Sequence, residues 1–390
     1  MFPINLTKEL IEWINSKGDR TPAFYYSADV IRAGVSKLKT ELGAKIVFST
    51  KANPHPIVLQ DMVNLVDEFN VTNLSDLDTL LQLNVDPGRI NWIHPVITSA
   101  TIKNILFRGV RKFVIDDERG LNLLSVEASN LLITLRMKPP DAGGSERSIV
   151  RFGNSKDIIL DLAKKVVVAG HKIEALSFFV GFAGVGMSGA HPFISGIKAL
   201  ACLHTDLRDQ GITVPVINIG GGFPGSQRQF YFKNPDFFYH IKHTIQENFD
   251  LNITVLCEPG RYIVEPCLLM ASRVIADREL MGRRMVYLDV SAYGGLFEKS
   301  FIDPDDDLAI ATQIEGNPKP ADLLGPIMDS FDVIKRNCSL PLLKEGDVLL
   351  LANVGAYAIG YSNRAEGIRT PDVFKMPDKL SLALSDVWYT

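Results

Sequence analysis

The chain of 390 residues has few of the features that mark specialised protein classes, and each scarcity excludes something. Its four cysteines, Cys202, Cys257, Cys267 and Cys338, are scattered, without the close pairing typical of metal sites and disulfide frameworks. We therefore expect reduced, buried thiols and no metal site. No apolar run is long enough to span a membrane, and there is neither a repeat of fixed period nor a low-complexity linker.

An excess of positive charge is also absent. The formal net charge is -4, and no cluster of Lys and Arg provides the basic surface that nucleic-acid binding requires. Hydrophobic residues make up 46% and charged residues 22%, which is typical of a soluble globular protein. Because Lys8 and Glu9 precede any long apolar stretch, we expect neither a signal peptide nor a membrane anchor, and a cytoplasmic location.

Eight short apolar segments alternate with helical patterns through the first two thirds of the chain. Parallel βαβ units are built in this way, and eight of them predict a closed (β/α)8 barrel. The predicted strands are residues 45–49, 68–72, 90–93, 112–115, 131–135, 175–180, 214–219 and 254–257.

The pattern changes after about Pro266. Residues 284–290, 347–353 and 380–388 are predicted as strands joined by loops, which indicates a second, all-β domain. At the other end, residues 7–14 have helical spacing, residues 24–26 predict a strand, and Ser27 is a plausible N-cap of the next helix.

Lys51 is the first candidate for chemistry. It follows the first predicted strand and precedes the turn residues Ala52-Asn53-Pro54. This position puts an amine at the C-terminal rim of the barrel, where barrel enzymes carry their active sites. Most lysines at strand ends are only solvated charges, but an amine at this rim can form a Schiff base with an aldehyde cofactor.

Four downstream motifs favour that second interpretation, although each alone is weak. A glycine triplet at 220–222 ends an apolar run and allows backbone N–H groups to approach a phosphate. Glu258-Pro259-Gly260-Arg261 ends another strand with an acid and a base. Gly-Pro-x-x-Asp at 325–329 and Gly-Ala-Tyr at 355–357 lie further on.

In this order the motifs resemble the pyridoxal-phosphate (PLP) decarboxylases of ornithine, lysine and diaminopimelate, and ornithine decarboxylase in particular. The resemblance runs from about Pro22 to about Val373. It implies an alanine-racemase-like fold, with a PLP-binding barrel over residues 25–265 and a β domain formed by 1–24 together with 266–390. It also implies a homodimer with shared active sites, in which the partner subunit donates the Gly-Pro-x-x-Asp loop.

The resemblance also implies roles for individual residues. Lys51 would hold the cofactor aldehyde, and Glu258 would pair with the pyridine nitrogen and keep it protonated. Asp329 and Asp303 would receive the distal ammonium of the substrate, and Arg147 would brace the site, although it could equally be a surface arginine. The expected phosphate ligands are Gly220, Gly221, Gly222, Gly260, Arg261 and Tyr357.

Four positions depart from the family pattern. Phe179 stands where a histidine stacks on the cofactor ring, Phe182 replaces a small hydroxyl residue, and Asn70 replaces an aspartate. Met328 occupies the position of the cysteine that controls protonation after carbon dioxide leaves. A thioether has no proton to donate, so that proton must come from elsewhere or reach another carbon.

Three functions therefore stay open. The first is a PLP-dependent decarboxylase of an amino acid with a distal amine, including modified or carrier-tethered derivatives made in polyamine or secondary-metabolite biosynthesis. The second is a decarboxylating transaminase or oxidase that yields an aldehyde, as Met328 allows. The third is a catalytically silent regulator, as occurs among relatives of ornithine decarboxylase. Amino-acid racemisation is disfavoured because the C-terminal motifs follow the decarboxylase pattern.

Overall fold

The computed structural model describes residues 3–18, 20–140, 151–181, 189–225, 228–302, 308–363 and 365–389. Internal contacts divide the chain into two units, and the division falls within helices α2 (Ala28–Leu42) and α3 (Pro56–Met62). The barrel unit comprises Val35–Lys51 and Leu59–Gly260. The sheet unit comprises Met1–Gly34, Ala52–Val58 and Arg261–Thr390.

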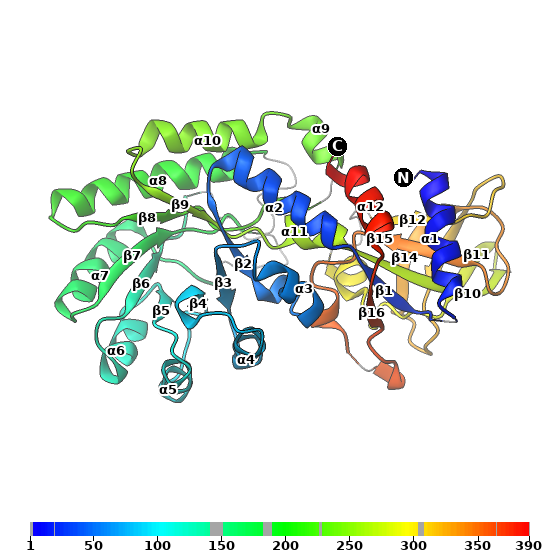
Figure 1. Cartoon of the computed structure of the whole chain (residues 1–390), viewed down its shortest axis with the longest axis horizontal. Helices are drawn as coiled ribbons and strands as arrows, with labels where there is room; N and C mark the ends of the chain where they lie inside the picture. Colours follow the sequence, from blue (N-terminus) through cyan, green and yellow to red (C-terminus); the bar gives the residue numbers. More distant parts are fainter. Residues whose placement is uncertain are drawn as a thin grey trace. The chain divides into compact units, whose positions relative to one another are not determined.

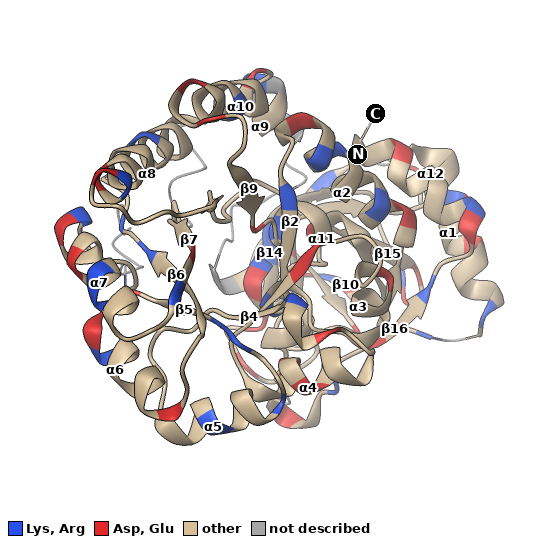
Figure 2. Cartoon of the chain, turned by 60° about the vertical axis from the view of Figure 1, so that its left-hand side comes forward, with Lys and Arg blue, Asp and Glu red and all other residues tan. Residues whose placement is uncertain are grey.

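The barrel unit is a closed ring of eight parallel strands (Figures 1 and 2). Each strand pairs with the next in sequence, and β9 pairs with β2 to close the ring. The strands are β2 (Lys45–Ser49), β3 (Glu68–Val71), β4 (Ile90–Trp92), β5 (Lys112–Ile115), β6 (Leu132–Arg136), β7 (Lys172–Ser177), β8 (Val216–Asn218) and β9 (Thr254–Cys257). The prediction of a (β/α)8 barrel is confirmed.

Helices surround this ring, and in Figure 2 their charged residues lie around the outside of the barrel. They are α4 (Leu74–Gln82), α5 (Ser99–Phe107), α6 (Glu118–Glu127), α7 (Lys156–Val168), α8 (His191–Asp209), α9 (Arg228–Lys233) and α10 (Phe237–Asn248), besides α2 and α3. The side chains of Asn73, Thr98 and Asp117 cap α4, α5 and α6 by accepting backbone N–H bonds. Among the helices in the described ranges, none has the combined length and apolar character needed to cross a bilayer.

The N-terminal ends of three barrel strands are joined by an ion cluster. The amine of Lys112, on β5, lies 2.7 Å from Glu68 Oε1 on β3 and 2.9 Å from Glu174 Oε1 on β7. Asn91, on β4, donates a hydrogen bond to Glu68 Oε2 at 2.9 Å. The three charged side chains expose only 11%, 22% and 23% of their surface, so each depends on its partners for solvation.

The sheet unit contains an eight-stranded sheet with the core order β12-β15-β10-β11-β13-β14, while β1 pairs with β10 and with β16. The strands are β1 (Ala23–Tyr26), β10 (Leu268–Leu280), β11 (Arg283–Leu288), β12 (Ala309–Ala311), β13 (Lys319–Leu324), β14 (Val333–Leu340), β15 (Val348–Ala352) and β16 (Asp372–Lys375). The antiparallel pairing of β1 with β10 brings the N-terminal segment into this sheet, as expected. Helix α1 (Ile4–Ser16) confirms the amphipathic segment, and Ser27 Oγ accepts from Val30 N at the start of α2.

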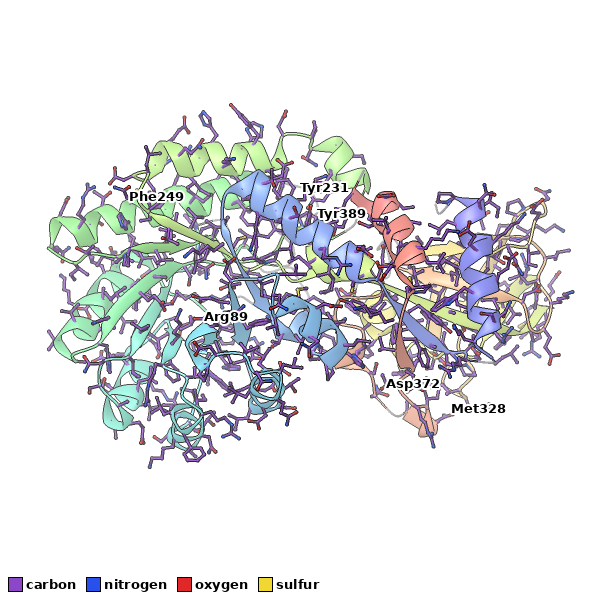
Figure 3. All side chains as sticks on the ribbon, in the orientation of Figure 1. Arg89, Tyr231, Phe249, Met328, Asp372 and Tyr389 are labelled. Atoms are coloured by element: carbon purple, nitrogen blue, oxygen red, sulfur yellow. The ribbon has the colours of Figure 1, made fainter. Side chains whose placement is uncertain are left out.

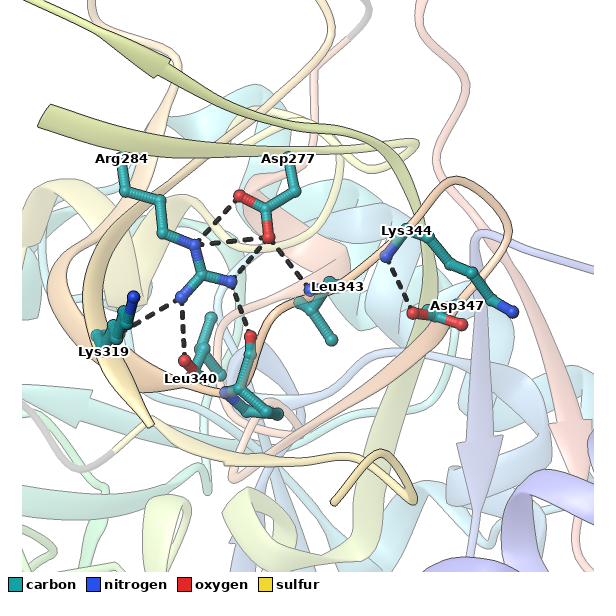
Figure 4. Close-up of polar contacts among 8 residues, drawn as sticks. Asp277, Arg284, Lys319, Leu340, Leu343, Lys344 and Asp347 are labelled. Carbon is teal, nitrogen blue, oxygen red and sulfur yellow. Dashed lines mark hydrogen bonds and ion pairs between the residues drawn. The ribbon is translucent and has the colours of Figure 1, made fainter. Parts of the chain in front are cut away.

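Arg284 and Asp277 form a polar centre where β10 and β11 meet (Figure 4). The Asp277 carboxylate accepts from Arg284 Nε at 2.9 Å and Nη2 at 2.6 Å, and also from the backbone N–H of Leu343 at 3.0 Å. The same guanidinium donates to Leu340 O at 2.8 Å. This fork therefore ties the hairpin to the loop that follows β14.

Two sequence-based expectations are wrong. Residues 380–388 are not a strand but belong to helix α12 (Asp378–Tyr389). Leu380, Leu382 and Leu384 alternate like strand residues, yet Leu and Ala favour helix, and burial at i and i+4 selects the helical period. All four cysteines are free, but Cys202 is exposed, in contrast to the other three.

The ion cluster predicts a stability difference between two lysines. Lys112→Met strands Glu68 and Glu174 in a poorly solvated place, and we expect it to lower the free energy of unfolding by about 2 kcal/mol. Lys165→Met breaks the exposed pairs with Glu118 and Asp161 and should lower the free energy of unfolding much less, because water solvates the carboxylates left behind. Urea unfolding followed by circular dichroism measures both, and equal losses would contradict the assignment.

Candidate active site

The C-terminal ends of the eight parallel strands meet at one rim of the barrel, and polar or aromatic residues gather there. Each residue of this set lies in the last two positions of its strand or follows it within a few positions. The set consists of Lys51 (β2), Asn70 (β3), His94 (β4), Asp116 (β5), Arg136 (β6), Phe179 (β7), Gly220 (β8) and Glu258 (β9).

Lys51 lies in a short 3-10 turn, η1 (Thr50–Ala52), directly after β2. The Thr50 hydroxyl anchors this turn, because it lies 2.8 Å from Asp76 Oδ2 and 3.0 Å from Asn70 O. Desolvation by surrounding protein atoms lowers the pKa of the Lys51 amine, and the charges of Arg136 and Arg151 lower it further, whereas Glu258 opposes them. A lowered pKa leaves more of the neutral amine, which is the nucleophilic form.

Glu258, directly after β9, is held by the side chain of Asn218 at the end of β8. Asn218 Nδ2 donates to Glu258 Oε1 at 2.7 Å, and Asn218 Oδ1 accepts from Gly220 N at 2.9 Å. The backbone N–H of Glu258 also donates to Gly220 O at 2.8 Å. An amide donor pairs with that oxygen as an acceptor, and within the described ranges no hydrogen bond is made to the second oxygen, Oε2.

The glycine triplet has a structural reason of its own. A Cβ at Gly220 would lie 2.1 Å from Phe178 O, and one at Gly221 would lie 2.5 Å from Glu258 O. Gly220 and Gly222 also have positive φ angles of 70° and 98°. Larger residues are therefore excluded because strand ends approach closely here, and the turn leaves its backbone open to a ligand.

Arg136 and Phe179 form the part of the rim that follows β6 and β7. The guanidinium carbon of Arg136 lies 5.4 Å from the ring centroid of Phe179 and 5.7 Å from that of Phe152. Burial lowers the pKa of Arg136, although the charges of Glu258 and Asp116 act in the opposite direction. Phe179 keeps 36% of its surface exposed, so the ring also has area left for a ligand.

In the sheet unit, Arg261 begins α11 (Arg261–Val264) and is engaged by two buried carboxylates. Its guanidinium bonds to Glu265 Oε1 at 2.9 Å and to Glu298 Oε1. The Lys299 amine lies 2.8 Å from the same Glu265 oxygen. Burial alone would lower the pKa of Arg261, but the attraction of Glu265 and Glu298 raises it, so the guanidinium stays charged.

Glu298 itself is not fully satisfied. Within the described ranges, its Oε2 is buried and has no hydrogen-bond partner. Burial raises the pKa of Glu298, while the positive charges of Arg261 and Lys299 only partly offset that effect. The cluster thus contains one carboxyl group that can gain a proton at low cost.

Tyr357 lies beside Arg261, with the guanidinium carbon 5.3 Å from its ring centroid. Its φ of 55° is uncommon for a tyrosine, and such strained backbone is concentrated at functional sites. The Tyr357 N–H donates to Ala52 O at 2.7 Å, and Asn53 Nδ2 donates to Gly355 O at 2.9 Å. The residues just after Lys51 are therefore tied to the Gly-Ala-Tyr turn.

The Gly-Pro-x-x-Asp loop is built around Asp332, whose carboxylate accepts from Ser291 Oγ at 2.9 Å and Ala292 N at 2.7 Å. The Asp329 carboxylate accepts from Phe331 N at 2.9 Å and Tyr293 Oη at 2.8 Å, and these bonds lower its pKa. Met328 exposes 93% of its surface and points away from the loop (Figure 3).

The expected site residues fall into three groups. Arg147, Phe182 and Asp303 lie outside the described residues. Lys51, Glu258 and the glycine triplet come together at the rim of the barrel unit, whereas Arg261 and Tyr357 come together in the sheet unit. In the described part of the chain, the hydrogen bonds of Asp329 reach Tyr293 and Phe331 but none of these residues.

Sequence reasoning missed Asn218 and Arg136. Asn218 is the residue that orients Glu258, and Arg136 is the charge that influences both Glu258 and Lys51. The available signal was a polar residue at the end of an apolar run, directly before the glycine triplet in one case and after residues 131–135 in the other. That signal is weak because surface positions share it.

The donor set suits an aldehyde cofactor with a basic ring nitrogen. An amine of lowered pKa can attach to an aldehyde, and a carboxylate held as an acceptor can bind a protonated ring nitrogen. Glycines of positive φ leave backbone N–H groups open to an anion. These residues fit pyridoxal phosphate, which combines all three groups.

Comparison with known proteins also indicates a pyridoxal phosphate site. Residues 28–265 match the family described as pyridoxal-dependent decarboxylase, pyridoxal binding domain. The chain is 25% identical over 390 residues to a probable ornithine decarboxylase of Dictyostelium discoideum, covering 94% of this chain and 82% of that protein. It is 26% identical over 399 residues to antizyme inhibitor 2 of Xenopus laevis, covering 96% and 85%.

The fold is also similar to that of a solved structure, the arginine decarboxylase of Paramecium bursaria Chlorella virus bound to agmatine. The TM-score is 0.86 at 21% identity, covering 95% of this chain and 100% of that one. Because the family match extends over more than half of the chain, we conclude that this protein belongs to the pyridoxal-dependent decarboxylases, whose cofactor is pyridoxal phosphate.

Proposed function

We propose that the protein decarboxylates an amino acid with a distal amine, such as ornithine, lysine or a modified or carrier-tethered derivative, in polyamine or secondary-metabolite biosynthesis. One observation carries the proposal most directly: the lowered pKa of the Lys51 amine at a barrel rim where Asn218 also fixes the Glu258 carboxylate. We also propose residues 25–265 as the cofactor-binding domain, and 1–24 with 266–390 as the second domain.

Each rim residue has a role in this proposal. When bound, pyridoxal phosphate accepts the electron pair that departing carbon dioxide leaves behind. Lys51 would hold the cofactor through its aldehyde and would be released as a free amine when the substrate binds. Glu258 keeps the ring nitrogen protonated, and Phe179 provides an aromatic face for the ring.

The phosphate ligands in the proposal come from backbone turns and from cationic or hydroxyl side chains. They are Gly220, Gly221, Gly222, Gly260, Arg261 and Tyr357, with Arg147 bracing the site. The positive φ angles of Gly220 and Gly222 support the first group. The charged state and aromatic neighbour of Arg261 support the second.

The distal ammonium of the substrate is assigned to Asp329 and Asp303. Two hydrogen bonds lower the pKa of Asp329, so its carboxylate is ionised at neutral pH and attracts a cation. Met328 cannot return a proton to the substrate carbon, so we assign that proton to Lys51 or to water.

The proposal predicts which amino acids the protein consumes. Purified protein incubated separately with ornithine, lysine, diaminopimelate and arginine should release carbon dioxide from at least one of them. Lys51→Ala should lower that rate below about one thousandth and abolish the near-visible absorbance of bound cofactor, because both depend on the amine. Lys165→Ala is the exposed-lysine control. No release from any of the four would reject the simple form of the proposal.

Asn218 predicts a change in pH dependence. In Asn218→Asp two carboxyl groups occupy one hydrogen-bonded position, and one of them must hold a proton near neutral pH. We expect kcat/KM to fall roughly tenfold at pH 7, with the acid limb of its pH profile displaced upward. Asn218→Gln, which keeps an amide, should leave the limb in place. A displaced limb in both variants, or in neither, contradicts the role.

Met328 favours a second candidate function. If the proton were delivered to the C4′ carbon of the cofactor instead of the substrate, loss of carbon dioxide and hydrolysis by one water would give an aldehyde and pyridoxamine phosphate. Mass spectrometry of the products decides, since the amine alone excludes this branch.

The similarity to antizyme inhibitor 2, together with Met328 and Asn70, favours a third candidate, a silent regulator. A cofactor absorbance band that disappears in Lys51→Ala would contradict this candidate, because a regulator need not bind the cofactor.

We further propose a homodimer in which each subunit donates its Gly-Pro-x-x-Asp loop. Met328 and Phe331 expose 93% and 69% of their surface, as expected of apolar residues that a partner covers. Lys51→Ala and Asp329→Ala should each be inactive alone. Mixed and re-associated, they should regain roughly a quarter of wild-type activity, because random pairing gives half of the dimers one intact site. No recovery, with exchange of subunits shown by mass spectrometry, argues against shared sites.

A further inference from the structure

Arg136 has an unmet demand for an acceptor. A guanidinium carries five N–H donors, and enclosing it without acceptors is costly. Within the described ranges, the Arg136 guanidinium has neither a hydrogen bond nor an ion pair, and the rings of Phe179 and Phe152 lie close to it. Aromatic rings offer no carbonyl or carboxylate oxygen to accept from its N–H groups.

The charges around Arg136 leave room for one anion. Lys51, Arg136 and Arg151 carry positive charge within electrostatic reach of one another, and Glu258 and Asp116 oppose them. Burial raises the pKa of Asp116, although its bond from Gly153 N at 2.6 Å acts in the other direction. Because the Lys51 amine is shifted toward its neutral form, the positive charge at this rim rests mainly on the two arginines, and Arg136 is the less exposed of them.

Two more polar groups on this rim lack partners. Asn70 Nδ2 and His94 Nδ1 are buried without a hydrogen bond in the residues that the structure covers. His94 lies on the same aromatic cluster, with its ring centroid 5.5 Å from that of Phe152. Unpaired buried polar atoms gathered at one rim are expected where a polar ligand binds.

We propose that Arg136, held between Phe152 and Phe179, binds a carboxylate of the amino-acid substrate. The planar fork of arginine matches a carboxylate with two parallel hydrogen bonds. The substrate amine takes the position of the Lys51 amine on the cofactor, and the α-carboxylate is attached to the carbon that bears that amine. The chemistry of the substrate itself thus places an anion near the position of the Lys51 amine. The inference rests on the proposed function.

The test uses three stable reduced adducts of pyridoxal phosphate, made with cadaverine, lysine and diaminopimelate. These amines form a nested series with none, one and two carboxylates on the same carbon chain. Binding to the cofactor-free protein is measured by calorimetry, without turnover. In the wild type the lysine adduct should bind about tenfold or more tightly than the cadaverine adduct, and Arg136→Met should remove this difference in affinity, called the step below. Arg136→Lys should keep part of it, because the charge persists without the fork.

Arg151→Met is the matched control, since Arg151 also influences Lys51 but is exposed. It should preserve the step. Loss of only the step from lysine to diaminopimelate in Arg136→Met would assign Arg136 to a distal carboxylate and still support the inference. Equal weakening of all three adducts, or equal loss of the step in both methionine variants, would overturn it. If the wild type binds no adduct, the cofactor assignment fails instead, so the two failures are distinguishable.

Discussion

The hydrogen-bonded link from Glu258 through Asn218 to Gly220 is the constraint on which the rim of the barrel depends. One side-chain amide donates to the Glu258 carboxylate and accepts from the Gly220 N–H, so it fixes two neighbouring strand ends at once. The close approach of Glu258 O to Gly221 then excludes any Cβ there. Carboxylate orientation and turn geometry are therefore a single feature, and neither can change without the other.

The sequence was most informative where a structure repeats. Buried parallel strands appear as short apolar runs bounded by turn residues, and eight such runs in series leave few alternatives to a barrel. The sheet unit lacks that regularity. β10 (Leu268–Leu280) is buried in its first half and exposed in its second, and it pairs with different strands along its length, so no single period describes it. Helix α12 was mistaken for a strand because its leucines alternate, while its packing follows the helical period.

The site shows a similar division. Lys51 and Glu258 could be predicted because motif order identified them, and the structure places both at the barrel rim. Asn218 and Arg136 could not, because their roles come from distances across strands that are remote in sequence. The sequence likewise gave no sign that Arg261 is held by Glu265 and Glu298, which depends on how α11 and a later π-helical segment meet.

Arg261 and Arg136 differ in how many hydrogen-bond acceptors surround the guanidinium group. Motif order assigns anion binding to Arg261, but two carboxylates already balance that guanidinium. Arg136 has the greater unmet demand, because aromatic rings surround it and supply no in-plane acceptor. Of the partners of Arg261, Glu298 is itself incompletely satisfied, because burial raises its pKa and, among the residues that the structure describes, no donor reaches its Oε2.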